Sequence, residues 1–153
     1  MQKPGTVFAL KAWGAAELKS AKTTTPELDA ALLLAHVLGC TKNDLLLRAS
    51  DKVSAEDTLA FAKLLFRRAD GMPVAYLTGR KDFWKSTFEV SPAVLIPKPD
   101  TELLVELAAK LVEERAHAQP ETLNIADICT GSGCIGISVF QEALDLQIKP
   151  EKL

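Results

Sequence analysis

One short stretch combines residue types that suit ligand binding. It reads Asp-Ile-Cys-Thr-Gly-Ser-Gly-Cys-Ile-Gly and runs from residue 127 to residue 136. An apolar run before it, residues 123–128, predicts a strand, and the apolar periodicity after it predicts a helix. Gly131 and Gly133 have no Cβ atom, so a ligand can approach the backbone closely. Backbone N–H groups at the start of the helix can then bind a polar or anionic group.

A plain strand-to-helix connection has the same signature, so the glycines alone do not establish a site. Cys129 and Cys134 flank them at a separation that does not suit a metal clip, and we interpret both as small buried side chains. His36 falls inside an apolar helical pattern, which favours a core or boundary residue over a catalyst. The sequence contains no Ser/His/Asp or Cys/His arrangement, so we predict neither a metal site nor a covalent nucleophile.

Composition narrows the class of protein. The chain has 153 residues, of which 48% are hydrophobic and 25% charged, and its formal net charge is −2. Such a balance is ordinary for globular proteins and provides no basic field for nucleic acid. No apolar run is long enough for a bilayer, and the N-terminus lacks the apolar core of a signal peptide. Three cysteines do not form a disulfide framework, so we expect a cytoplasmic protein.

The first part of the sequence predicts a helical bundle, and capping signals mark where its helices begin. We expect an early helix over about residues 6–20. Thr25-Pro26-Glu27 begins a second helix, which Gly39 ends. Thr41 to Asp44 and Ser54 to Asp57 resemble capping boxes that begin two more. The predicted apolar positions of the last helix are the following: Leu59, Ala62, Leu65 and Phe66.

The middle of the sequence predicts a hairpin followed by a long amphipathic helix. Residues 82–90 alternate as two short strands around a Lys85-Ser86 turn, which places Phe88 and Val90 on one face. A helix then begins near Asp100. Its predicted apolar stripe consists of these residues: Leu103, Leu104, Leu107, Ala108, Leu111 and Val112. We therefore predict an α+β fold with three parts: a helical domain over residues 1–72, a hairpin or linker over 73–98, and a further domain over 99–153.

Several of these segments resemble one known family. Residues 73–79 read Pro-Val-Ala-Tyr-Leu-Thr-Gly, Phe83-Trp84 follows, and residues 94–105 read Val-Leu-Ile-Pro-Lys-Pro-Asp-Thr-Glu-Leu-Leu-Val. Together with the helical segment 28–39 and the glycine turn, they closely resemble the HemK/PrmC family of protein-(glutamine-N5) methyltransferases. The block Ile-Pro-Lys-Pro-Asp-Thr-Glu is the specific part, because many methyltransferases share the glycine turn.

The resemblance implies a function. Members of the family methylate the glutamine in the Gly-Gly-Gln loop of class 1 peptide-chain release factors, and S-adenosylmethionine is the methyl donor. It implies that the helical domain recognises the release factor and that residues 99–153 begin a Rossmann-like catalytic domain. Cys129, Thr130, Gly131, Ser132 and Gly133 match the family's cofactor loop. Residues 97–102 are expected beside the same pocket, with no catalytic role assigned.

The sequence also departs from the family pattern. Cys129 stands where the family usually has glycine, and Lys98 replaces the usual arginine, which loses a planar fork of donors. The acidic residue that closes the second strand and the Asn-Pro-Pro-Tyr motif that holds the substrate amide do not occur in the 153 residues. We therefore expect the N-terminal half of such an enzyme, with no catalytic residue of its own and a strand at 123–128 that lacks neighbours.

Two other functions fit the same sequence. One is a non-catalytic module that binds a release factor through the helical domain. The other is an amino-methyltransferase that acts on DNA bases, which has a similar catalytic motif in its family. The acidic charge balance and the type of helical domain argue against the DNA reading. Pull-down of a release factor without methyl transfer would favour the binding module.

Overall fold

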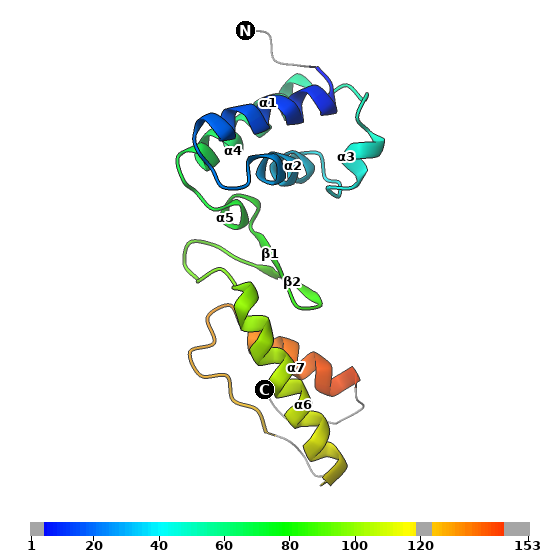
Figure 1. The fold of residues 1–153 in the computed structure, drawn as a ribbon, viewed down its shortest axis with the longest axis vertical. Helices are drawn as coiled ribbons and strands as arrows, with labels where there is room; N and C mark the ends of the chain where they lie inside the picture. Colours follow the sequence, from blue (N-terminus) through cyan, green and yellow to red (C-terminus); the bar gives the residue numbers. More distant parts are fainter. Residues whose placement is uncertain (1–4, 119–123, 146–153) are drawn as a thin grey trace. The chain divides into compact units, whose positions relative to one another are not determined.

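The computed structural model describes residues 5–118 and 124–145. It divides into two compact units, the first formed by Met1–Thr78 and the second by Gly79–Leu153. The first unit is entirely helical, and the second combines a hairpin with two helices (Figure 1). The α+β class predicted from the sequence is therefore confirmed. The predicted three-part division into residues 1–72, 73–98 and 99–153 stays a prediction.

The first unit consists of five helices; the first four lie at the predicted places, whereas the fifth falls within residues 73–98, where a hairpin or linker was predicted. They are α1 (Val7–Ser20), α2 (Pro26–Val37), α3 (Asp44–Leu47), α4 (Ala55–Ala69) and α5 (Val74–Thr78). α1 contacts α2, α3 and α4, and α5 contacts α2 and α4. Isolated helices of these lengths are marginal in water, so they depend on one another for stability.

Local capping explains where these helices begin and end. The Thr6 hydroxyl accepts a hydrogen bond from the Ala9 N–H, and the Ser54 hydroxyl accepts one from the Asp57 N–H at 3.0 Å. Thr41 and Asp44 form a reciprocal box, in which each side chain accepts a hydrogen bond from the other residue's backbone N–H. Gly39 follows α2 with a φ of +59°, a conformation that favours glycine.

The core of the first unit lies between α1, α2 and α4. Gly14 of α1 permits close packing, because a Cβ atom there would lie 2.6 Å from the ring of Phe61. The Trp13 ring packs edge-on against the Phe61 and Phe66 rings. The largest buried apolar side chains of this core are Val7, Leu10, Leu18, Leu33, Leu34, Phe61 and Leu65.

The buried face of α4 agrees with the prediction at Ala62 and Leu65 and differs from it at Leu59 and Phe66. Leu59 and Phe66 are 53% and 52% exposed, whereas Phe61, Ala62 and Leu65 are buried. The helix is rotated because the ring of Phe61 occupies the space that Gly14 leaves open on α1. Sequence periodicity marked several apolar positions, but only the packing against α1 selects the buried ones.

A buried ion pair links α2 to α4. The Arg68 Nε donates to Asp29 Oδ2 at 2.7 Å, and the Thr25 hydroxyl donates to Asp29 Oδ1 at 2.9 Å. The Asp29 and Arg68 side chains are only 7% and 17% exposed. Arg68 also donates to the carbonyl of Met72, just after α4. A charge removed from water is costly unless it is paired, so each of these two residues depends on the other.

The second unit begins with the predicted hairpin. Strands β1 (Arg80–Phe83) and β2 (Ser86–Glu89) pair antiparallel, with Phe83 opposite Ser86. The turn therefore consists of Trp84 and Lys85, one residue earlier than predicted. Trp84 has a φ of +54°, which a non-glycine residue rarely adopts. Its backbone N–H donates to the Glu102 carboxylate at 3.0 Å, and this contact supports the turn in that position.

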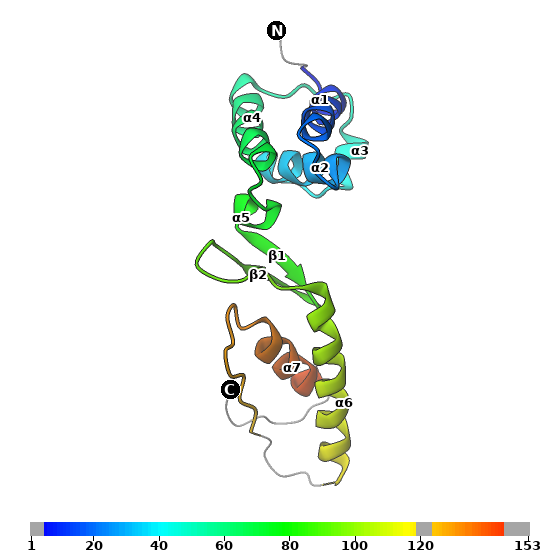
Figure 2. The same cartoon turned by 60° about the vertical axis from the view of Figure 1, so that its left-hand side comes forward.

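Helix α6 (Glu102–Ala118) follows a short 3-10 turn at Pro99–Thr101, and α7 (Cys134–Asp145) packs against it (Figures 1 and 2). The buried cluster of this unit contains Phe83, Phe88, Val105, Val112, Cys134, Val139 and Ala143. The predicted stripe of α6 is confirmed for Val112, which is buried, and for Ala108, which packs against the cluster, and it is wrong for the leucines. Four of its leucines are at least half exposed or nearly so: Leu103, Leu104, Leu107 and Leu111.

The reason is that the hairpin and α7 pack against the Val105 and Val112 side of α6. The apolar residues on this side, Val105 and Val112, are smaller than the leucines on the other side. Val90, the end of the predicted hairpin face, is buried together with Phe88, as expected. The leucines of α6 are the most apolar part of its sequence pattern. Among the described residues, however, the buried side of the helix is the side of Val105 and Val112.

The strand predicted at residues 123–128 does not form over residues 124–128, and Leu123 lies outside the described residues. A strand needs a hydrogen-bonded neighbour, and β1 and β2 pair only with each other in the described sheet. Ile125 packs against the buried cluster, while Ile128 is 86% exposed. Asn124 forms an isolated β-bridge, residues 125–127 have no regular secondary structure, and Ile128 begins a turn, so no continuous strand forms in the described part of this segment.

The buried ion pair generates the first prediction. Arg68→Met leaves the Asp29 carboxylate buried and unpaired, so we expect the first unit to lose about 3 kcal/mol of stability. Hydrogen exchange of the Leu33 and Leu65 amides should then accelerate roughly 100-fold. Arg67→Met is the control, since Arg67 is the exposed neighbour on the same helix, and it should change stability by at most about 0.5 kcal/mol. Equal effects of the two variants would contradict the prediction.

Candidate functional site

The candidate site is the loop that connects segment 124–127 to α7. All five residues predicted to bind a cofactor lie in it: Cys129, Thr130, Gly131, Ser132 and Gly133. The N–H of Gly133 donates to the carbonyl of Thr130 at 2.9 Å, which closes a tight turn. The N–H of Ile137 then donates to the carbonyl of Gly133, so Gly133 is the residue directly before the first residue of α7.

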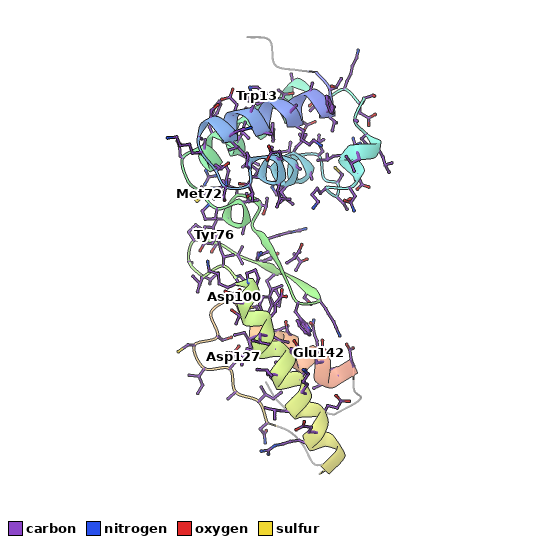
Figure 3. All side chains as sticks on the ribbon, in the orientation of Figure 1. Trp13, Met72, Tyr76, Asp100, Asp127 and Glu142 are labelled. Atoms are coloured by element: carbon purple, nitrogen blue, oxygen red, sulfur yellow. The ribbon has the colours of Figure 1, made fainter. Side chains whose placement is uncertain are left out.

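Asp127 holds this loop in place. Its Oδ2 accepts a hydrogen bond from the Gly136 N–H at 2.9 Å and another from the Thr130 hydroxyl at 3.0 Å. Figure 3 labels Asp127 on the segment ahead of α7. Gly136 lies in the first turn of α7, where backbone N–H groups lack partners inside the helix. One carboxylate therefore joins both ends of the loop and caps the helix.

The backbone of the loop turns through three left-handed residues. Cys129, Gly131 and Gly133 have φ values of +65°, +58° and +77°. Glycine adopts this region without strain, whereas Cys129 pays a steric cost. Cys129 is also exposed, so the prediction that it is a buried filler is wrong; the turn directs its side chain away from the packed cluster. Cys134, at the start of α7, is buried as predicted.

The loop leaves room for a ligand. A Cβ atom added at Gly131 would meet no atom within 4 Å, so the space beside this residue is open. In the part of the chain that the structure describes, the N–H groups of Gly131 and Ser132 have no hydrogen-bond acceptor. Open space beside unpaired donors fits a ligand with a carboxylate. The Asp127 carboxylate offsets part of the positive helix end, which also suits a ligand that carries an ammonium group.

The hairpin turn fixes α7, and thereby the loop ahead of it. The Trp84 indole N–H donates to the Glu142 carboxylate, and the Lys85 Nζ lies 2.8 Å from Glu142 Oε1. The Ser86 hydroxyl donates to Gln141 Oε1 at 2.9 Å. Figure 3 labels Glu142 on α7. We call these side chains the hairpin clamp: Trp84, Lys85, Ser86, Gln141 and Glu142.

Hydrogen bonds and charges within the hairpin clamp shift the pKa values of Glu142 and Lys85. The hydrogen bonds from Lys85 and Trp84 hold the pKa of the Glu142 carboxyl below its ordinary value, although partial burial opposes this. The same Glu142 carboxylate, followed by that of Asp145, raises the pKa of Lys85. Glu142 is therefore charged in the folded unit at neutral pH and remains charged into the acidic range.

Three further points from the sequence concern metal ligands, His36 and residues 97–102. No group of His, Cys, Asp and Glu side chains suited to a metal ion occurs within residues 5–118 and 124–145. His36 is exposed, so it is a surface residue rather than a core residue. The placement of residues 97–102 beside a cofactor pocket stays a prediction, and Glu102 serves the hairpin turn through the Trp84 N–H.

Sequence reasoning missed the role of Asp127. Its signal was present, because the acid lies two positions before the loop residues 129–133 and nine positions before Gly136, whose N–H it binds. Only the fold of the loop shows that this N–H comes within reach. Asp127 is thus a residue that positions the loop, and the five residues predicted earlier form the surface that it positions.

Comparisons with known proteins agree on one family. Residues 9–79 match the PrmC N-terminal domain. The release factor glutamine methyltransferase of Aliivibrio fischeri is 40% identical over 124 residues, which are 81% of this chain and 42% of that protein. The release factor glutamine methyltransferase of Vibrio cholerae is 41% identical over 141 residues, 92% of this chain and 46% of that protein.

A third relative matches nearly the whole chain, and its match, like that of the Vibrio cholerae protein, includes the loop. The release factor glutamine methyltransferase of Rhodopirellula baltica is 36% identical over 146 residues, which are 95% of this chain and 49% of that protein. Residues 129–133 therefore lie within the aligned region. The chain spans about half the length of the curated relatives that it matches. In the described residues, no helix combines the length and apolar character needed to cross a membrane.

The hairpin clamp generates a prediction about pH. The pKa of Glu142 is depressed below its ordinary value of 4.5, so its contribution to stability is present above pH 4.5 and is lost as pH falls through the lower folded value. The indole N–H resonance of Trp84 should therefore be constant near neutral pH and should shift below pH 4.5. Glu142→Gln should abolish this titration. A midpoint above 4.5, or the same titration in the Gln variant, would contradict the assignment.

Proposed function

Since the chain belongs to the HemK/PrmC family, we propose that it takes part in methylation of the glutamine in the Gly-Gly-Gln loop of class 1 peptide-chain release factors. The observation that carries the proposal is the match to three release factor glutamine methyltransferases, two of which include the glycine loop in their aligned regions. The reaction is transfer of a methyl group to the N5 amide nitrogen in the cytoplasm.

The cofactor that we propose is S-adenosylmethionine, which supplies an electrophilic methyl group on a sulfonium. The residues that would hold its methionine part are Cys129, Thr130, Gly131, Ser132 and Gly133. The open space at Gly131 and the unpaired N–H groups of Gly131 and Ser132 support this assignment. Asp127 acts by holding both ends of the loop, so the donors point in a constant direction.

Positioning is the main task of the protein in such a displacement, because the amide nitrogen must approach the methyl carbon in line. In this chain the loop and α7 provide one side of that geometry, and the hairpin clamp holds α7 in place. The residues that would orient the acceptor amide belong to an Asn-Pro-Pro-Tyr segment in the family, which the 153 residues do not contain. We assign no catalytic residue to the described part.

A second candidate function is a release-factor-binding module without turnover. The specific observation in its favour is that the first unit is compact by itself and coincides closely with the matched N-terminal domain, residues 9–79. In both proposals the helical unit recognises the release factor. They differ in whether methyl transfer follows, and they do not involve direct binding to nucleic acid or membrane.

The proposed cofactor loop generates a prediction about binding. Gly131→Val should abolish binding of S-adenosylmethionine, because a branched side chain would fill the open space and disfavour a φ of +58°. Gly39→Val is the matched control: Gly39 has a φ of +59° and equally open surroundings, but it lies in the helical unit. Titration calorimetry should detect weak binding by the unchanged chain and the control only. Unchanged binding by Gly131→Val would place the cofactor elsewhere.

The proposed reaction is tested by transfer of a radiolabelled methyl group to a purified class 1 release factor. We expect a chain extended by the C-terminal part of a relative to label the release factor. The 153 residues alone should not, because misplacement of an acceptor by about 1 Å already costs on the order of 100-fold in rate. Binding without labelling by the extended chain would favour the binding module. Efficient labelling by the 153 residues alone would show that the acceptor site lies within them.

A further inference from the structure

Helix α7 has the candidate site at one end and the hairpin clamp at the other. The loop residues 129–133 precede the helix, whereas Gln141 and Glu142 lie in or next to its last turn. Figure 3 labels Asp127 ahead of α7 and Glu142 near its end. Glu142 comes nine positions after Gly133, which corresponds to about 13 Å along a helix. The clamp and the loop are therefore separate in space but share one helix.

The loop and the packed side of α7 fix the direction of this helix only weakly. Gly131 and Gly133 have no Cβ atom, so they restrict the backbone little. On the packed side of α7, Gly136 and Ala143 are small, and the buried Ser138 hydroxyl has no hydrogen-bond partner among the described residues. Small side chains provide few contacts, and a buried hydroxyl without a partner costs free energy. Contacts from elsewhere must therefore hold α7 in one orientation.

One residue of the hairpin turn reaches two helices at once. The backbone N–H of Trp84 donates to the Glu102 carboxylate on α6 at 3.0 Å, and its indole N–H donates to the Glu142 carboxylate on α7. The Glu142 side chain is only 15% exposed, so water competes little for the second bond. Hydrogen bonds to carboxylates are stronger than those between neutral groups. Trp84 therefore fixes the position of α7 relative to α6.

A further bond fixes the rotation of α7 about its own axis. The Ser86 hydroxyl donates to Gln141 Oε1 at 2.9 Å. Gln141 and Glu142 are consecutive, so their side chains leave the helix about 100° apart. Two contacts at different angles around a helix prevent it from turning. The intact clamp thus gives α7 both one direction and one rotation.

We propose that Trp84 and Ser86 are positioning residues for the cofactor loop, and that they act on it from the far end of α7. The clamp keeps the N–H groups of Gly131 and Ser132 in the direction in which they meet the carboxylate of the cofactor. A change of about 5° in the direction of α7, with its clamped end as pivot, would move the loop by about 1 Å, which is enough to impair binding geometry. The identity of the ligand, S-adenosylmethionine, rests on the proposed function.

A purely structural role for the clamp makes a different prediction. If the clamp only stabilised the second unit, its loss would lower the fraction of folded molecules, but each folded molecule would bind the cofactor with unchanged affinity. If the clamp positions the loop, the folded molecules themselves bind more weakly. NMR resonances of the folded form report that form alone, so they separate the two roles.

The test is a titration of the 153-residue chain with S-adenosylmethionine, followed by NMR. Trp84→Phe keeps an aromatic ring but removes the indole donor, and Ser86→Ala removes the hydroxyl. Each should raise the Kd of the folded form about fivefold. The two variants remove different bonds, so each tests the proposal by itself if the other fails to fold.

Two controls match these variants. Trp13→Phe removes an indole donor of the same kind, because the Trp13 N–H donates to the Glu17 carboxylate at 3.0 Å within α1. Ser86→Thr changes the side chain but retains the hydroxyl that donates to Gln141. Both controls should keep a Kd within about twofold of that of the unchanged chain.

The same spectra provide a readout that needs no cofactor. Gly136 lies in the first turn of α7 and Gly133 directly before it, at the opposite end from the altered contacts. Without ligand, their amide resonances should shift in Trp84→Phe and Ser86→Ala and should stay in place in the two controls. Such a shift would show that the clamp reaches the loop through the helix.

The outcomes separate this proposal from the proposed function. If the clamp variants leave the Kd of the folded form unchanged, the positioning proposal is wrong, whether or not the glycine resonances shift, and the proposed function stands. If the unchanged chain and the extended chain both fail to bind S-adenosylmethionine, the proposed function is wrong. Shifted glycine resonances would in that case still support positioning of the loop by the clamp, and unshifted ones would overturn it.

Discussion

Six of the seven α-helices in the described residues have 15 residues or fewer, a length at which an isolated helix is marginal in water, so the structure depends on burial of one face of each helix against another. The first unit satisfies this requirement fully. Gly14 admits the Phe61 ring, and α1, α2 and α4 close around a continuous apolar cluster. The buried Asp29–Arg68 pair is tolerated there because each charge compensates the other.

The second unit satisfies the same requirement differently. Helix α6 buries Val105 and Val112, while the leucine side remains exposed among the described residues. Polar contacts add to what the small apolar cluster provides, since the hairpin turn bonds to α6 through Glu102 and to α7 through Glu142. The glycine loop is therefore held from both sides, by the hairpin clamp through α7 and by the Asp127 carboxylate directly.

The sequence predicted helix positions well, because caps such as Ser54 and a terminating glycine such as Gly39 act within a few residues. It predicted buried faces poorly. The burial of Phe61 instead of Phe66 depends on Gly14, which lies on another helix. The five residues of the cofactor-loop prediction are contiguous in the sequence and lie in one loop, and their role stays a prediction, whereas the contact of Asp127 depends on a fold that returns Gly136 to it.

The exposed thiol of Cys129 has a chemical consequence. Cys134 is buried and Cys40 is half-buried, so reagents that modify thiols would meet Cys129 first among the described cysteines. Cys129 lies two residues before Gly131, beside which the space is open. A fluorophore attached there would report occupancy of the loop directly, and its attachment would itself be slowed by any molecule already seated in that space.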